Sequence, residues 1–561
     1  MLQITVGKVV AFATVAAYPL SKATDLAYSN SLFRVLPVSI LVWAVVKCLL
    51  YPNFFSPLRH LPSVDADKWW SPQSLKIFRG NRGDCQAEWV DNIPHNGLIR
   101  YRTVTNQERI LVASPEALGE VLVTKSYQFV KPEVVVTALK QTAGMGILLA
   151  EGDHHKAQRK SLMPAFTFRH IKDLYSTMWD MSAYAVDALM HDAASKKDLT
   201  IDITDWASSV TLGIICVAGL GSDMESVLSQ DSSYTNLRKI YRSVFHQERA
   251  DIIMFFLRVW VLPAWALPLI PLKRNRVLKR AGQSLRSECR KLIRQKKLEL
   301  ENGVTDETEK NILTVALSYG GFTDEELVDQ LLTFLAAGHE TTATALTWAI
   351  YILSTRPEIQ TRLREEIRAN LPAPSSSSSP NTQELAATID SHMPYLSAVC
   401  REVLRFFSPV SMTFREAAVD TAIQGCKIPK GTQIVICPRA TNRDETLWGE
   451  DAKTFNPERY LSQGKQEHSD PLDEDHHSRK STTGHRSNYA TLTFLHGPRS
   501  CIGQSFSKAE LAILVSTLVG RFKFSLADES QADLKNIRLR RGGINRPVNG
   551  LNVKVKLVDG W

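Results

Sequence analysis

Two apolar stretches open the chain before any mixed polar and apolar pattern begins. The first runs from about Ile4 to Leu20, and the second runs from Phe33 to Tyr51. As a helix rising ~1.5 Å per residue, the second spans roughly 28 Å, about one hydrocarbon core. Arg34 and Lys47 lie near its ends, where long side chains can reach the headgroups. The pattern predicts a transmembrane helix at about 33–51. The alternative is a cleaved signal peptide followed by a buried helix.

A proline-rich segment follows. Prolines at positions 52, 57 and 62 lie within eleven residues, which predicts a stiff, non-helical hinge over 53–62. The expected organisation is therefore a hydrophobic region over 1–52, this hinge, and one soluble body over 63–561. The pattern leaves open whether one or both apolar stretches cross a membrane.

The soluble body has mainly helical periodicity with a few early strands. Alternation over 99–112 predicts a short hairpin, and 3.6-residue periods dominate from Glu151 onward. Thr323-Asp-Glu-Glu326 forms the pattern of a capping box at the start of a long apolar helix. Ser507 to Val519 is expected to be an amphipathic helix. The fold class predicted is mainly α with small β-sheets.

Three segments depart from this pattern. Two polar stretches, at about 372–382 and 461–488, cannot bury enough apolar area to order themselves and are expected to be flexible insertions. The histidines of the second are expected to lie in a solvated loop rather than a metal site. Residues 252–271 are apolar but interrupted by prolines, which fits either core packing or a loop that dips into a bilayer.

Composition narrows the setting. The net charge is +9, a moderate basic excess that favours an acidic protein partner or an anionic lipid surface. No element that would read nucleic acid is evident, so no nucleic-acid partner is expected. The eight cysteines are scattered, which fits reduced thiols better than a disulfide framework.

One cysteine lies in a glycine-rich turn at 494–506. The N–H groups of such a turn, together with the helix that follows, can stabilise the thiolate of Cys501 as a metal ligand. Gly497 and Gly503 would let the backbone pass close to a flat macrocycle, and Arg499 would suit a carboxylate on that macrocycle.

This turn resembles the haem-ligand signature of the cytochrome P450 family, F-x-x-G-x-R-x-C-x-G, at every fixed position. The resemblance extends from the hinge to the C-terminus and is nearest to the microsomal type of filamentous fungi. It implies the cytochrome P450 fold with a membrane anchor. It also implies haem b (iron protoporphyrin IX) between a long central helix and the cysteine loop, with Cys501 as the axial ligand of the iron.

Phe334 to Ala343 resembles the family's A-G-x-[D/E]-T-T helix on the oxygen-binding side of the haem. Its Ala-Gly pair is expected to open one helix face so that a bulky group can approach. By resemblance, Thr341 would hydrogen-bond bound oxygen, and Glu340 would help relay protons.

Further family positions are matched in order. The resemblance implies that Glu402, Arg405 and Arg459 form a buried structural charge cluster. It also implies that Arg159 and Arg415, together with Arg499, neutralise the haem propionates. The chain departs from the family at His155, where tryptophan is common, although an imidazole N–H can still donate to a propionate.

The activity implied is that of a haem-dependent monooxygenase. No flavin or nicotinamide motif is present, so electrons are expected from NADPH-cytochrome P450 reductase, with cytochrome b5 as a further candidate donor. The basic helix around Lys156, Arg159 and Lys160 is the expected docking face. The expected location is the endoplasmic reticulum membrane, with the catalytic domain facing the cytosol.

The segments expected to line the substrate pocket are 134–148, 334–337, 410–414 and 543–548. They are mostly apolar, which suits a lipophilic small molecule such as a polyketide, terpenoid or alkaloid intermediate. A fatty acid or a xenobiotic is the alternative substrate. A peroxide-rearranging relative and a non-enzymatic haem-binding sensor or carrier are alternatives of another class, and the intact Glu340-Thr341 pair disfavours both.

Overall fold

The computed structural model separates into two compact units. The first unit comprises residues 1–80, 84–130 and 414–436, and the second comprises 81–83, 131–413 and 437–561. The strands of the first unit come from two distant parts of the chain. The single soluble body expected over 63–561 stays a prediction. The structure describes residues 6–24, 27–64, 73, 76–77, 80–103, 106–195, 199–222, 224, 227, 233–245, 273–302, 311–374, 380–461, 487–540 and 543–561.

The first unit begins with helices α1 (Val6–Ala23) and α2 (Tyr28–Val45), and α2 continues as the π-helical segment η1 (Val46–Phe55). The continuous helix Tyr28–Phe55 is long and apolar enough to cross a membrane, and it extends beyond the predicted span at both ends. The expected non-helical hinge is therefore wrong for residues 53–55. Pro52 has no N–H to donate, yet the helix continues past it in a π-type pattern. At its end the Ser56 N–H donates to the Tyr51 carbonyl at 2.9 Å.

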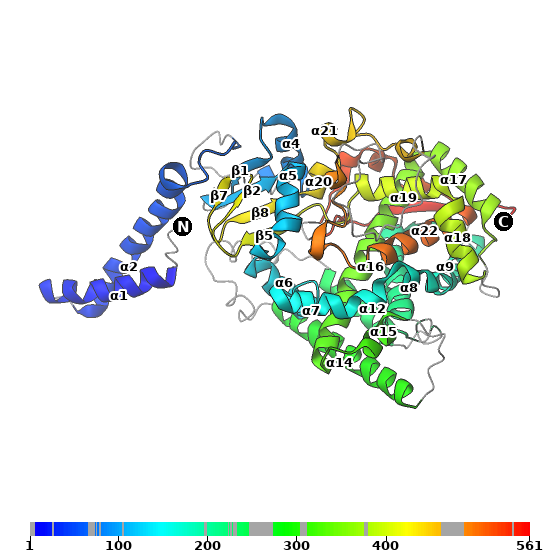
Figure 1. The fold of residues 1–561 in the computed structure, drawn as a ribbon, viewed down its shortest axis with the longest axis horizontal. Coiled ribbons are helices and arrows are strands. Elements are labelled where there is room, and N and C mark those ends of the chain that lie inside the picture. Colours follow the sequence, from blue (N-terminus) through cyan, green and yellow to red (C-terminus); the bar gives the residue numbers. More distant parts are fainter. Residues whose placement is uncertain are drawn as a thin grey trace. The chain divides into compact units, whose positions relative to one another are not determined.

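A five-stranded sheet forms the rest of the first unit (Figure 1). Its order is β1-β2-β8-β5-β3. β1 pairs antiparallel with β2 in the register Arg100↔Ile110, which confirms the predicted hairpin, and β2 pairs parallel with β8. The bounds are β1 Leu98–Arg102, β2 Glu108–Val112, β3 Phe129–Val130, β5 Thr413–Ala417 and β8 Gln433–Ile436, with the ribbon β6 Thr421–Ile423 and β7 Cys426–Ile428. The short helices of this unit are α4 Asp84–Asn92, α5 Pro115–Gly119, η3 Glu120–Thr124 and η4 Ser126–Gln128.

Side chains of the sheet cap the end of the long apolar helix. Arg100 donates to the carbonyl of Pro52 and forms an ion pair with Glu108 at 2.7 Å. Arg102 donates to the side chain of Asn53 at 2.9 Å. The last carbonyls of a helix have no partner within the helix. Arg100 satisfies one of these carbonyls, and both arginines join the helix to β1.

The second unit is a helical body with one small sheet. Helix α16 lies in its core, against α10, α14, α6 and α22 (Figure 1). Its helices are α6 Glu133–Ala143, α7 Gly152–Leu162, η5 Met163–Phe166, α8 Phe168–Asp173, α9 Tyr175–Ser195, α10 Ile203–Ile214, η6 Ile215–Gly219, α12 Ser233–Phe245, α14 Lys273–Glu301, α15 Ile312–Tyr319, α16 Asp324–Thr355, α17 Pro357–Asn370, α18 Thr382–Ala387, η8 Thr388–His392, α19 Pro394–Phe406, α20 Pro438–Thr441, α21 Glu445–Trp448, η9 Pro457–Tyr460, η10 Asn488–Ala490, η11 Gly497–Arg499, α22 Gln504–Arg521, η12 Glu529–Ala532 and η13 Leu534–Asn536. The sheet has the order β4-β10-β9, with bounds Leu199–Asp202, Asn552–Leu557 and Phe522–Leu526.

Two helices of this unit test the local predictions. At the start of α16, the Thr323 hydroxyl accepts from the Glu326 N–H and the Glu326 carboxylate accepts from the Thr323 N–H, which confirms the capping box. Helix α22 was expected to be amphipathic, but that prediction is wrong: most of its residues are buried. Helices α9, α16, α17 and α19 surround it, and its polar residues Glu510, Ser516 and Thr517 are buried as well. Residues 252–271, residues 375–379 of the first predicted insertion and residues 462–486 of the second lie outside the described residues.

Glu510 shows the consequence of this burial. It lies on α22 near the Thr342 hydroxyl of α16, and burial raises the pKa of its carboxyl well above the ordinary value. The folded state holds the proton of such a carboxyl more tightly than the unfolded state does. The free energy of unfolding is therefore highest below the pKa of the unfolded chain and falls as the pH rises toward the pKa of the folded protein. Burial therefore favours the neutral acid form of Glu510 in the folded protein.

We expect Glu510→Gln to raise the free energy of unfolding at neutral pH, because a neutral amide has no proton to lose. The gain should grow with pH by about 1.4 kcal/mol per pH unit above 4.5, up to the folded-state pKa of Glu510. Urea unfolding between pH 5 and 8 measures it. Glu529→Gln, at an exposed position, is the control. Equal slopes for wild type and Glu510→Gln would contradict the prediction.

Candidate active site around Cys501

The Cys501 loop folds back on itself directly before α22. The N–H of Cys501 donates to the carbonyl of Phe494 at 2.9 Å, and the N–H of Ser500 donates to the carbonyl of Gly497 at 2.9 Å. The turn requires positive φ at Leu495 (57°) and at Gly497 (77°). Glycine adopts that conformation without strain, which explains the residue at position 497.

The thiol of Cys501 differs from the other cysteines in its environment. All eight cysteines are described, none is in a disulfide, and Cys501 alone among them is classed as exposed. Protein still surrounds the sulfur densely, and this desolvation raises the pKa of the thiol. The backbone N–H of Gly503 and the charge of Arg159 lower that pKa and so favour the thiolate. Accessibility and thiolate-stabilising groups together are what a metal-binding cysteine requires.

Gly503 provides a test of whether a flat cofactor fits here. Its φ is −86°, which any residue adopts, and a Cβ built on it would meet only Phe166, at 4.0 Å. Neither the backbone conformation nor the protein neighbours therefore demand glycine at this position. A bound planar group that approaches the backbone closely would demand it, so the residues of the loop fit a haem.

Cations from two elements gather beside the loop. Arg159 of α7 donates to the Ser500 carbonyl at 2.8 Å and to its hydroxyl at 3.2 Å. Arg499 donates to the carboxylate of Glu151 at 2.6 Å, a partner that the sequence did not reveal. His155 is buried next to them, and burial together with the charges of Arg499, Lys131 and Arg159 lowers its pKa to about 4. The imidazole is therefore neutral near neutral pH.

Arg415 belongs to the first unit. It lies in β5, is buried, and donates to the carbonyl of Phe414 at 2.9 Å. Its predicted contact with a haem propionate stays a prediction.

The predicted acid and alcohol lie in the middle of α16. The hydroxyls of Thr342 and Ser507 are 3.2 Å apart, so this part of α16 meets the start of α22, just after Cys501. Thr341 donates its hydroxyl to the Ala337 carbonyl at 2.8 Å. Gly338 was expected to open the helix to a bulky group. In the structure Gly338 packs against Ile215 of η6, which would lie 3.2 Å from a Cβ, and the approach of a bulky group stays a prediction.

Glu340 is held in a buried polar network. Its carboxylate accepts from the Ser208 hydroxyl at 2.6 Å and from the Arg546 guanidinium at 2.7 and 2.9 Å. Burial alone raises the pKa of Glu340, but His339, Arg546 and the hydrogen bonds from Ser208 and Arg546 outweigh it and lower the pKa below the ordinary value. Burial lowers the pKa of His339 and so favours its neutral form. Arg546 is therefore the cation that keeps Glu340 ionised.

Arg546 continues this network toward solvent. Its guanidinium lies 3.9 Å from Asp205, and Asp205 lies 3.8 Å from Arg238. Side-chain exposure rises along the series, from 2% at Glu340 to 11% at Arg546, 30% at Asp205 and 48% at Arg238. Arg546 is 206 residues from Glu340, so no local pattern could have identified it, although it lies within the segment 543–548 that was expected to line the substrate pocket.

Glu402, Arg405 and Arg459 come together in a cluster without solvent contact at Glu402 and Arg405. The Arg405 guanidinium uses all five of its N–H groups: two bonds of 2.7 Å reach Glu402, and three reach backbone carbonyls of Asn442, Ala452 and Thr454. Arg459 lies 3.2 Å from Glu402 and also pairs with Asp451. A buried charge with every donor satisfied holds these segments in one arrangement.

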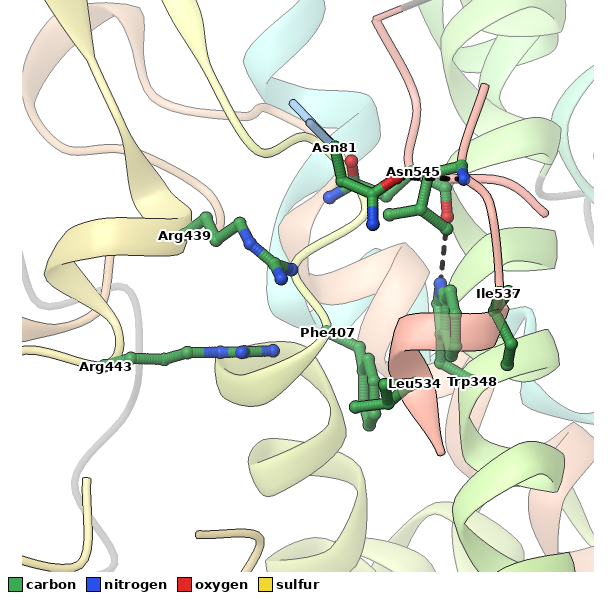
Figure 2. Close-up of a pocket in the computed structure, with 9 residues that line it drawn as sticks. Asn81, Trp348, Phe407, Arg439, Arg443, Leu534, Ile537 and Asn545 are labelled. Atoms are coloured by element: carbon green, nitrogen blue, oxygen red, sulfur yellow. Dashed lines mark hydrogen bonds between the residues drawn. The ribbon is translucent and has the colours of Figure 1, made fainter. Parts of the chain in front are cut away.

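A small cavity of the second unit lies apart from these residues. It has a volume of about 30 Å³ and is lined by Asn81, Trp348, Phe407, Arg439, Arg443, Leu534, Ile537, Leu539 and Asn545. In Figure 2, Arg439 and Arg443 extend toward it, and Trp348 and Phe407 lie beside it. It has room for about one or two water molecules. This volume is too small for a lipophilic substrate, and Asn545 is the one residue of the lining that belongs to the predicted substrate segments.

Arg405→Met should unfold the protein more easily, because it leaves the Glu402 charge buried without its main partner. We expect a loss of about 3–5 kcal/mol in the free energy of unfolding. Arg362→Met is the matched control, since Arg362 pairs with Glu458 at an exposed position and should cost less than about 1 kcal/mol. Urea unfolding of both variants measures the difference. Equal losses would show that the cluster is not structural.

Comparisons with known proteins agree with the geometry. A family model described as Cytochrome P450 matches residues 98–554. The chain is 44% identical to cytochrome P450 monooxygenase ALT8 of Alternaria alternata, over 93% of each chain. It is 45% identical to cytochrome P450 monooxygenase FUM15 of Gibberella moniliformis, over 95% of this chain and 94% of that one. It is 42% identical to cytochrome P450 monooxygenase sphH of Aspergillus fumigatus, over 92% of this chain. The chain therefore belongs to the cytochrome P450 family of haem-thiolate monooxygenases.

Proposed function

We propose that this enzyme inserts one oxygen atom from dioxygen into a lipophilic intermediate of fungal secondary metabolism. The observation that carries the proposal is the accessible Cys501 thiol in its glycine turn, beside Arg159, Arg499 and neutral His155. A polyketide, terpenoid or alkaloid fits the mostly apolar segments expected to line the pocket, because such substrates bury apolar area and offer few polar handles.

The cofactor that fits is haem b. The Cys501 thiolate would bind its iron, and Arg159, Arg499 and Arg415 would neutralise its propionates, with His155 donating one N–H. When bound, this cofactor supplies the activation of dioxygen, which a thiolate ligand promotes. Arg499 already pairs with the carboxylate of Glu151. A propionate is also a carboxylate, so it would bind Arg499 in place of Glu151 or together with it.

Glu340 and Thr341 would handle protons. Glu340 is the buried carboxylate nearest to Thr341 in sequence, and the Arg546–Asp205–Arg238 series offers a polar route from solvent to it. Arg546 would be a positioning residue in this scheme: it keeps Glu340 ionised and must loosen its hold when the carboxylate takes up or passes on a proton. The Thr341 hydroxyl, already donating to Ala337, can accept a hydrogen bond at the same oxygen.

Electrons would come from NADPH-cytochrome P450 reductase, with cytochrome b5 as a further candidate. The support is the basic surface of α7, where Lys156 is about half exposed and pairs with Asp153 of the same helix at 2.7 Å. The apolar helix Tyr28–Phe55 supports a membrane anchor. The proposed location is the endoplasmic reticulum membrane, with the catalytic body facing the cytosol.

Cys501→Ala tests the haem-thiolate proposal. We expect it to abolish the thiolate-type absorption band of the reduced, carbon monoxide-bound protein, and to abolish transfer of one atom from isotopically labelled dioxygen into a fed precursor. Cys426→Ala, at a partly exposed cysteine on a β-ribbon, should keep both. Retention of the band in Cys501→Ala would reject Cys501 as the ligand. Turnover without a reductase would reject the monooxygenase reaction.

Arg546→Gln tests the positioning role. Because Arg546 lowers the pKa of Glu340, its removal should raise that pKa and move the acid limb of the turnover–pH profile up by about one pH unit. Arg546→Lys keeps the charge and should leave the limb near its wild-type position. In Glu340→Gln/Arg546→Gln the shift should disappear, since the titrating carboxyl is gone. Identical profiles for Arg546→Gln and wild type would contradict the role.

A further inference from the structure

Helix α1 packs against α2 along a face of small residues. Ala13 and Ala17 have no exposed surface, and Val9 is buried beside them on the same face of α1. Ser31 of α2 is also fully buried. The Tyr28 hydroxyl donates to the carbonyl of Thr14 at 2.9 Å, so the start of α2 is tied to the middle of α1. Small residues let two helices approach closely, which is how helices associate in lipid.

The two helices are antiparallel. Only residues 24–27 connect them, and helices that pack together across so short a connection must run in opposite directions. Figure 1 shows α1 and α2, in dark blue, meeting at one end. The start of α1 therefore lies at the same end of the pair as η1, which leads into the sheet.

The outward faces of both helices are apolar. On α1, Phe12 is 66% exposed and Val15 is 72% exposed; on α2, Phe33 is 80% exposed and Leu41 is 63% exposed. Neither helix contains an Asp or a Glu. An apolar surface that surrounds a helix pair is not stable in water, and its natural environment is lipid. The apolar part of α1, Val9–Ala23, is shorter than the Tyr28–Phe55 helix and covers about 22 Å of a hydrocarbon core of ~30 Å at ~1.5 Å per residue.

We propose that α1 and α2 cross the bilayer together as a helical hairpin. The N-terminal end of α1 and the catalytic body then lie on the same side of the membrane, and the end of α1 and the start of α2 lie on the other. This inference rests on the membrane anchoring proposed above. Charge does not select the topology, because Lys8 and Lys47 lie near one end of the hairpin and Lys22 and Arg34 near the other. The proposed hairpin rests on the packing of α1 against α2.

Glycosylation mapping in microsomes tests the hairpin. A flexible tag with an N-glycosylation site is placed in three versions of the full chain: before Met1, within the turn at 24–27, and after Trp561. Such a site is modified only in the lumen. The hairpin predicts modification of the turn tag and of neither terminal tag. Modification of the N-terminal tag would mean that α2 spans alone and would overturn the proposal, as would absence of modification on all three tags in a membrane-integrated protein.

Extraction with alkaline carbonate separates the two claims. If the chain is washed from the membrane, the anchoring itself fails; if it stays and the tag pattern is wrong, only the hairpin fails.

Variants in the helix interface test the role of packing. In Ala13→Leu/Ala17→Leu the larger side chains should force the helices apart, and a measurable fraction of the N-terminal tag should become glycosylated. Val15→Leu, on the outward face, is the control and should leave the tag unmodified. Leucine is more apolar than alanine, so poorer insertion cannot explain a change. An unmodified N-terminal tag in both variants would show that the interface does not set the topology.

Discussion

The arrangement of the cysteine loop depends on one buried ion pair. Arg405 and Glu402 have no contact with solvent, and such a pair is stable only if the geometry satisfies every donor. Arg405 meets that condition by binding the carbonyl of Asn442 among others. The Asn442 side chain in turn accepts from the Leu492 N–H at 2.7 Å and donates to the Thr493 hydroxyl at 2.9 Å. Phe494 follows directly, and its carbonyl receives the N–H of Cys501. The ligand loop is thus held by a chain of contacts that begins at a desolvated charge.

The same constraint operates on Glu340, another buried carboxylate. Glu340 lies in an apolar helix, where an isolated charge would be too costly, so the chain supplies Arg546 and Ser208 from distant segments. The two networks differ in their access to water. Glu402 and Arg405 are fully enclosed, whereas the Glu340 network becomes more exposed step by step through Arg546 and Asp205. A sealed pair suits a structural role, and a pair with a polar route outward suits proton exchange.

In the first unit, carbonyl groups at the end of the apolar helix need partners in the same way as the buried carboxylates do. The apolar helix ends where β1 supplies Arg100 and Arg102 to its last residues, and η1 carries the helix past Pro52 to Phe55. The apolar helix is therefore attached to the sheet by specific hydrogen bonds rather than by a loose proline hinge.

The sequence by itself determined the features whose causes lie within a few residues. The capping box at Thr323, the hairpin from Leu98 to Val112, the apolar span and the glycine turn around Cys501 all follow from local patterns. Tertiary structure alone decided the rest. The pairing of Glu340 with Arg546 and of Arg499 with Glu151 joins residues 206 and 348 positions apart, and α22 is buried on all sides because four other helices cover it. Local periodicity reports which face of a helix is apolar, but it carries no information on which distant charge will meet a buried one.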